Sequence, residues 1–209
     1  MAIASKLTAI GMIALSLAVG FLSFYIFSSL TKEEKKVQLG ELTSQLINFI
    51  LFIWLGKIIL NISIFISDPL SILAYPSDSK SFYFAIILIA LLLLYKSQRK
   101  NMNVLPLFES FTHIFLIGSF VYEFMQFVVE DNSYAFGYLI LSSILIGIFF
   151  FLQDRLPVEM LLIFIVTIWS IGIIILGLVP PFVTVFGYIM APWFVALFVG
   201  LSVLGLVIK

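Results

Sequence analysis

The feature of this sequence that most limits its fold is a series of long apolar runs without a charged side chain. The first of them, residues 8–30, covers 23 positions. An α-helix of roughly 20 residues crosses the hydrocarbon core of a bilayer. The run also exceeds the apolar core of a signal peptide, which is about 7–15 residues long. We therefore interpret it as a retained membrane-spanning helix.

The composition extends this interpretation to the whole chain. Of the 209 residues, 63% are hydrophobic and only 11% are charged, whereas soluble domains are about 45–50% apolar and about 25% charged. Eleven basic and eleven acidic residues cancel, so no net charge attracts nucleic acid. The chain has no cysteine and a single histidine, His113, which argues against disulfides and metal sites. We expect an integral membrane protein with no cofactor, no metal and no nucleic-acid partner.

Charged and turn-forming segments divide the chain into seven apolar runs. The breaks are the charged cluster at 31–36, the turn signals at 68–69 and 75–78, the basic segment at 96–103, the acidic turn at 130–132, the segment 153–157, and the proline pair at 180–181. The resulting spans are about residues 8–30, 43–66, 81–95, 105–129, 133–152, 158–178 and 182–208.

These runs predict an all-α polytopic membrane protein, a bundle of seven transmembrane helices that forms a single domain over residues 1–209. The gaps between the runs are short, so no soluble domain is expected. The third run is short, and its helix can extend through Lys96. The last run contains Pro192, which lacks a backbone donor, and we expect a kink there.

Basic residues are distributed unevenly between alternate loops. With the N-terminus outside, the outer side holds only Lys6 and Lys80. Because cytoplasmic loops are enriched in lysine and arginine, we predict the N-terminus out and the C-terminus in. The inner side then holds Lys32, Lys35, Lys36, Lys96, Arg99, Lys100, Arg155 and Lys209.

Ionisable side chains within two of the runs form polar stripes. At about 100° per residue, Glu109, His113 and Glu123 share one face of the fourth run. Lys57 and Asn61 share a face of the second run. Buried charges usually face the interior of a bundle, so both stripes should point inward. The depths of Lys57 and Glu123 differ by roughly 5 Å, which predicts an ion pair or a water-bridged contact.

Two interpretations of these stripes stay open. In the first, the ion pair only fixes the register of the bundle. In the second, Lys57, Asn61, Glu123 and Gln126 line a polar cavity for a ligand or a lipid headgroup. For His113, the structural interpretation is an interior side chain that only contributes to packing.

The remaining acidic residues also have structural rather than functional interpretations. Glu109 is interpreted as a solvated residue near the inner surface, and Glu130 and Asp131 as a solvated outer turn. No motif of a soluble enzyme is present, and no catalytic residue is assigned.

Three segments within residues 43–137 carry a family resemblance. They are Leu55-Gly56-Lys57-Ile58 with Asp68-Pro69-Leu70, the basic loop 96–100 with residues 105–109, and residues 118–127 with 134–137. These segments resemble the Gly–Arg–Leu stretch, the basic loop and the Gly-Arg-x-Gly-Asn-Phe signature of the prolipoprotein diacylglyceryl transferase family. The resemblance implies a seven-span fold with the N-terminus outside. It also implies transfer of a diacylglyceryl group from phosphatidylglycerol to a lipoprotein cysteine.

The chain departs from that family at its signature residues. Glu123 stands where the signature has its arginine, Gln126 replaces the asparagine, and Phe82 and Tyr83 stand in place of a His-Gly-Gly motif. An arginine would clamp a lipid phosphate, whereas a glutamate repels it. The resemblance therefore implies a divergent member that handles lipids or lipoproteins in the plasma membrane of a prokaryote. Its partners would be a phosphatidylglycerol-like phospholipid and a lipoprotein or another membrane protein.

Two further functions stay open beside this one. The first is a small-solute or proton-coupled transporter, or the membrane subunit of a transporter, because titratable side chains at several depths can relay protons. The second is an active transferase with altered chemistry. Whether the protein is an enzyme is left open by the sequence.

Overall fold

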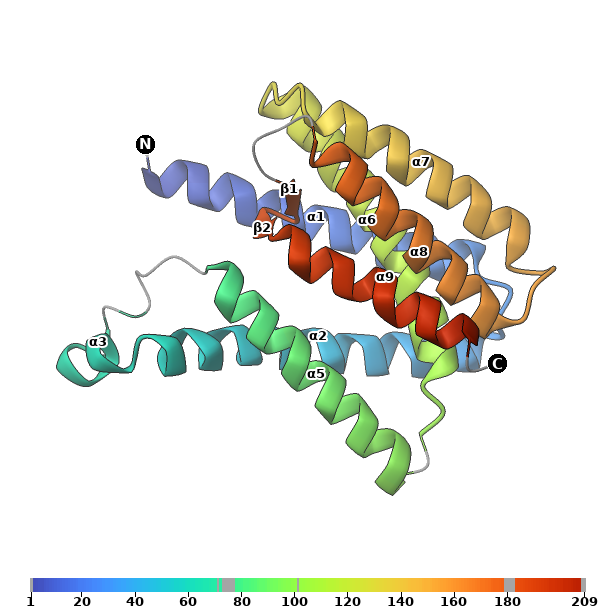
Figure 1. Ribbon diagram of the computed structural model, residues 1–209, viewed down its shortest axis with the longest axis horizontal. Helices are drawn as coiled ribbons and strands as arrows, with labels where there is room; N and C mark the ends of the chain where they lie inside the picture. Colours follow the sequence, from blue (N-terminus) through green and yellow to red (C-terminus); the bar gives the residue numbers. More distant parts are fainter. Residues whose placement is uncertain (1, 71, 73–77, 101, 179–182, 208–209) are drawn as a thin grey trace. The chain divides into compact units, whose positions relative to one another are not determined.

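The computed structural model describes residues 2–70, 72, 78–100, 102–178 and 183–207, and this part of the chain is predominantly helical (Figure 1). One short β-hairpin precedes the last helix. The elements are α1 (Ala2–Phe27), α2 (Lys32–Leu60), α3 (Ile62–Ser67), α5 (Ser79–Lys100), α6 (Leu105–Val129), α7 (Ala135–Leu152), α8 (Val158–Leu176), β1 (Val183–Val185), β2 (Tyr188–Met190) and α9 (Pro192–Val207).

Six helices in the described part of the chain are long and apolar enough to cross a membrane. They are Leu7–Phe27 within α1, and the whole of α2, α5, α6, α7 and α8. This confirms a multi-pass helical membrane protein, and no soluble domain is evident among the described residues. The count of seven spans and the orientation stay predictions.

Several helix boundaries agree with the sequence pattern, and others are extended. Helix α6 has the predicted bounds, and α5 runs beyond the predicted 81–95, through Lys96 to Lys100. Helix α2 begins at Lys32, well before the predicted residue 43, so the charged cluster forms helical turns rather than a loop.

A capping box explains this early start of α2. The Glu34 carboxylate accepts a hydrogen bond from the main-chain N–H of Thr31. The Thr31 hydroxyl oxygen in turn accepts one from the main-chain N–H of Glu34. These reciprocal bonds satisfy main-chain donors that the first turn of a helix otherwise leaves unpaired.

The predicted helix over 182–208 is wrong for its first part. Residues 183–190 form an antiparallel hairpin in which Val183 pairs with Met190. Its two turn residues, Phe186 and Gly187, both have positive φ, 48° and 80°, as a two-residue hairpin turn requires. Pro192 begins α9 instead of kinking a longer helix, because its missing N–H costs nothing at the first helical position. The predicted breaks at 75–77 and 180–181 lie outside the described residues.

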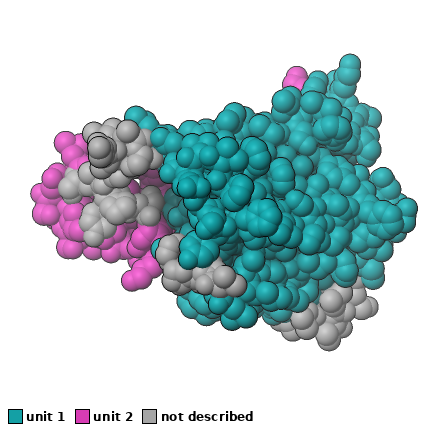
Figure 2. All heavy atoms as spheres, turned by 90° about the horizontal axis from the view of Figure 1, so that it is seen from above, with its two compact units in different colours: residues 1–35, 108–209 teal, residues 36–107 magenta. Residues whose placement is uncertain are grey.

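The chain divides into two compact units, coloured teal and magenta in Figure 2. Unit 1 contains residues 1–35 and 108–209, which carry α1, most of α6, α7, α8, the hairpin and α9. Unit 2 contains residues 36–107, which carry most of α2, together with α3 and α5.

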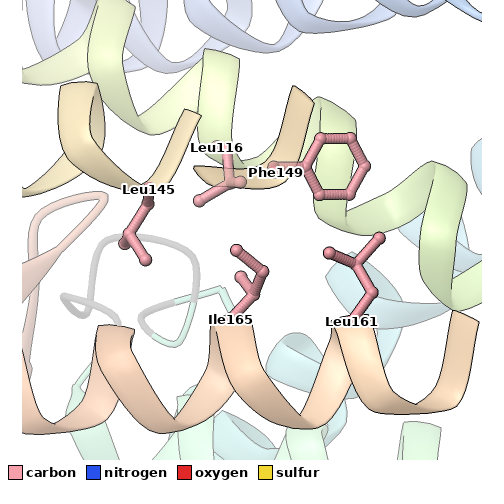
Figure 3. Close-up of a cluster of buried hydrophobic side chains, with 5 residues drawn as sticks. All are labelled: Leu116, Leu145, Phe149, Leu161 and Ile165. Atoms are coloured by element: carbon pink, nitrogen blue, oxygen red, sulfur yellow. The ribbon is translucent and has the colours of Figure 1, made fainter. Parts of the chain in front are cut away.

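Unit 1 is built around an apolar cluster between three helices. Leu116 of α6, Leu145 and Phe149 of α7, and Leu161 and Ile165 of α8 are almost completely buried. Figure 3 shows these side chains directed into the space between the helices. Helix α8 also packs against α9.

The contact between α1 and α6 in unit 1 depends on small residues. A Cβ atom at Gly20 would lie only 2.6 Å from the carbonyl oxygen of Ile114, and one at Gly118 would lie 3.4 Å from that of Ser16. Small residues allow membrane helices to approach this closely.

Unit 2 is an antiparallel pair of helices, α2 and α5. Near one end, Lys96 of α5 forms an ion pair with Glu41 of α2. Near the other end, a Cβ at Gly56 would lie 3.2 Å from main-chain atoms of Ser81. Since both contacts are separated by equal lengths of α2 and α5, they fix the register of the pair.

Candidate functional site

A small cavity lies in unit 1, between α6, α7, α8 and the hairpin. Its volume is about 20 Å³, and an ordered water needs roughly 10–15 Å³. It therefore has room for one water molecule or one small ion. The polar residues of its wall are Ser119, Tyr122, Glu123, Tyr138, Ser142 and Thr184.

Two polar pairs on neighbouring helices supply most of these groups. Ser119 and Glu123 are four residues apart on α6, and Tyr138 and Ser142 are four residues apart on α7. Residues at this spacing lie on one face of a helix, one turn apart. With Tyr122, helix α6 thus presents three oxygen-bearing side chains to the cavity, and α7 presents two. They lie toward the carboxyl end of α6 and the amino end of α7.

The hairpin closes the cavity on another side. Thr184, Val185 and Phe186 belong to its wall. The ring of Phe186 packs against those of Tyr122, at 5.3 Å between centroids, and Phe115, at 6.0 Å. The hairpin therefore places non-helical backbone beside the cavity. A bulky residue at positive φ is strained, so these ring contacts hold Phe186 in place.

Glu123 is the charged group of this cavity. Its side chain is 7% exposed, and within the described part of the chain its carboxylate makes no hydrogen bond or ion pair. The Tyr138 hydroxyl is also buried without a hydrogen bond, although it lies near the main-chain N–H of Thr184. A buried ionised carboxylate is costly unless a cation or hydrogen-bond donors accompany it. The cavity thus brings a buried carboxyl group and a buried hydroxyl group together in one place.

The predicted residues Lys57 and Asn61 lie in unit 2. The Asn61 side-chain amide donates a hydrogen bond to the carbonyl oxygen of Lys57 at 2.9 Å, next to the end of α2. Lys57 is buried, and its ammonium lies 5.8 Å from the ring centroid of Trp54. Because Lys57 and Glu123 belong to different units, the contact between them stays a prediction.

Gln126 lies one turn beyond Tyr122 on α6 and is not part of the cavity wall. Its amide is 3.4 Å from the Tyr122 hydroxyl and 4.0 Å from the sulfur of Met12. Glu130 and Asp131 are exposed in the turn that follows α6, where Asp131 has a φ of 52°. Asp tolerates this left-handed conformation better than most residues.

His113 and Glu109 share α6 with Glu123 but have other surroundings. The Nε2 atom of His113 lies 3.1 Å from the Ser23 hydroxyl, and its ring meets Phe150 edge-on at 5.1 Å. His113 thus packs between α1 and α7. Glu109 is half-buried and close enough to Asp154 for electrostatic repulsion. Of the three polar residues on this predicted stripe, only Glu123 lines the cavity.

The sequence interpretation missed Tyr138, Ser142 and the hairpin. Tyr138 and Ser142 share one face of α7, but no signal in the sequence links that face to Ser119 and Glu123 on α6. The hairpin had a signal, because Phe186-Gly187 follows the β-favouring run Val183–Val185. The surrounding apolar sequence concealed that signal, since it also suits a buried helix.

The helices and the cavity together define a multi-pass helical membrane protein with a polar site inside one of its units. No protein-family model, no curated protein and no solved structure matches this chain. The ligand of the site must therefore be inferred from the chemistry of its wall.

Proposed function

We propose that this protein is a membrane transporter, or the membrane subunit of one, and that the cavity at Glu123 binds the species that it moves or the ion that is coupled to it. The observation that carries the proposal is the buried Glu123 carboxylate, which faces a cavity and has no partner among the described residues. Ionisable groups inside membrane helices typically mark ion or substrate pathways.

The position of the cavity supports this proposal. Glu123 lies six residues before the end of α6, or about 9 Å along the helix axis. An ion that enters from the nearby aqueous side would have a short path to the carboxylate. Glu109 lies 14 residues away on the same helix, or about 21 Å. Helix α6 thus carries an acidic group near each of its ends.

The hairpin beside the cavity supports it as well. Many transporters form their ion sites where regular helices are interrupted, because the exposed backbone can then contribute ligands. Here β1 and the turn at Phe186 supply such backbone to the cavity wall.

The test is a flux measurement in proteoliposomes under a potassium diffusion potential, with a pH-sensitive or a Na⁺-sensitive dye inside. We expect cation entry above that of protein-free liposomes, reduced at least about tenfold in Glu123→Gln. Glu130→Gln, in the exposed turn, is the matched control and should behave like the unmodified protein. No flux above the protein-free level, or equal flux in Glu123→Gln, contradicts the proposal.

Lipid or lipoprotein handling is the second candidate, and the resemblance of residues 43–137 to the diacylglyceryl transferases favours it. The cavity at Glu123 is too small for a lipid headgroup, so this function needs a different site that includes Lys57. It predicts that phosphatidylglycerol copurifies with the protein and that Lys57→Ala releases it. Transfer of radiolabel from phosphatidylglycerol to a cysteine peptide would separate an active transferase from a lipid-binding relative.

A further inference from the structure

The ligand atoms around the cavity are predominantly oxygens. The side chains that carry them are the carboxyl group of Glu123 and the hydroxyl groups of Ser119, Tyr122, Tyr138, Ser142 and Thr184. None of the described wall residues is a histidine or a methionine, and the sequence contains no cysteine. Oxygen ligands suit hard cations, whereas zinc and copper prefer nitrogen or sulfur.

The charge of the wall limits the charge of the ligand. Among the described residues of the wall, Glu123 is the single acidic one and none is basic. Calcium sites use six to eight oxygen ligands that typically include several carboxylates. One carboxylate among neutral hydroxyls instead balances one positive charge.

The volume limits the size of the ligand. About 20 Å³ holds one water-sized particle. An organic ammonium ion or an amino acid would need the hairpin to move away. A Na⁺ ion without its full hydration shell, or a proton on the carboxylate beside one water, fits without any such change.

We infer that this cavity is a binding site for one small monovalent cation, either Na⁺ or a proton. Glu123 supplies the charge, and the Tyr138 hydroxyl completes the coordination together with Ser142. The buried Tyr138 hydroxyl is the second, independent observation. Among the described residues it makes no hydrogen bond of ordinary geometry, although the main-chain N–H of Thr184 lies near it, so a lone pair of its oxygen is available to a ligand. The inference deepens the proposed function by naming the cation, but it concerns equilibrium binding and can be tested without transport.

Few other titratable groups face Glu123, which keeps a pH experiment interpretable. Tyr122 on α6 and Tyr138 on α7 line the same cavity, and Glu130 acts on Tyr122 from the turn. The described wall residues of α8 and the hairpin are Trp169, Ile173 and residues 184–186, and they do not titrate near neutral pH.

The experiment measures thermal unfolding of the detergent-purified protein at constant ionic strength, with NaCl replacing choline chloride, over a series of pH values. If the cation is Na⁺, the midpoint rises saturably with Na⁺, by about 5 °C at a hundredfold excess over the dissociation constant. Glu123→Gln abolishes this rise, and Glu130→Gln retains it. If the cation is a proton, the midpoint depends on pH but not on Na⁺. The difference in midpoint between the unmodified protein and Glu123→Gln should then change with pH.

A second variant removes a ligand without removing the charge. Tyr138→Phe keeps the ring and deletes the hydroxyl, so the Na⁺ concentration at half-saturation should rise about tenfold. If the cation is a proton, the pH at which the unfolding temperature changes should shift instead. This variant decides the matter even if Glu123→Gln does not fold.

The inference is overturned if neither Na⁺ nor pH changes the unfolding midpoint in a way that depends on Glu123 or Tyr138. If flux depends on Glu123 but neither Na⁺ nor pH stabilises the protein in this way, the proposed transport function stands for another solute and the cation site is contradicted. Saturable cation stabilisation without flux would contradict transport and leave the binding site in place.

Discussion

Glu41 in unit 2 and Glu123 in unit 1 lie on membrane-spanning helices in opposite surroundings. Glu41 pairs with Lys96 and also accepts a hydrogen bond from Gln45, whereas Glu123 faces a cavity and has no partner among the described residues. The first carboxylate is part of a helix-helix contact, and the second lines a cavity between helices and the hairpin. The comparison separates a charge that fixes register from a charge that is available to a ligand.

The units also differ in how closely their helices approach. In unit 1, a Cβ at Gly20 would lie 2.6 Å from a backbone oxygen, while in unit 2 the corresponding distances at Gly56 are 3.1 Å or more. Of these two contacts, the closer one lies in unit 1, which also holds the cavity.

The largest effect is expected at the α1–α6 contact. Gly20→Leu should lower the free energy of unfolding by about 3 kcal/mol, because the side chain would meet main-chain atoms of Ile114. Gly11→Ala on the same helix is the control, since a Cβ there meets nothing within 4 Å. A titration with sodium dodecyl sulfate that monitors helix content measures both. Equal effects would show that α1 and α6 do not rely on this contact.

A smaller effect is expected at the tip of the hairpin. Gly187 has a φ of 80°, and a side chain in this left-handed region costs about 1–2 kcal/mol. Gly187→Ala should therefore destabilise the protein by about 1.5 kcal/mol in the same titration. Gly187→Asn should cost less, because Asn tolerates positive φ. If both substitutions are neutral, the turn does not hold the cavity wall.

The ion pair of unit 2 should contribute about 1 kcal/mol. Lys96→Met leaves the Glu41 carboxylate without its cation, and the two side chains are partly exposed, 18% and 29%. The double variant Lys96→Met with Glu41→Gln should recover most of the loss. A double-mutant cycle in unfolding free energies tests this, and a coupling near zero would remove the contrast between the two glutamates.

The sequence predicts the helical membrane architecture well, because runs of about 20 apolar residues have few other structures. It predicts the bounds of α6 for the same reason, and it singles out Glu123 as a candidate because carboxyl groups are rare in such runs. It fails at residues 183–190, where an apolar segment suits either a helix or a hairpin and tertiary packing decides. It also misses Tyr138 and Ser142, because hydroxyl groups are common in membrane helices and only the folded arrangement brings them to one cavity.

The smallest effect on stability, with the opposite sign, is expected at Glu123 itself. Since the side chain has no partner to lose among the described residues, Glu123→Gln replaces a buried carboxyl group, which is costly to ionise there, by a neutral amide of the same shape. In choline chloride at neutral pH, the free energy of unfolding should stay unchanged or rise by up to about 1 kcal/mol, as is common where a functional site is traded for stability. A loss as large as that of Lys96→Met would mean that Glu123 holds the fold together as Glu41 does. A gain in stability together with a loss of cation binding would instead show that this carboxylate is kept for its ligand.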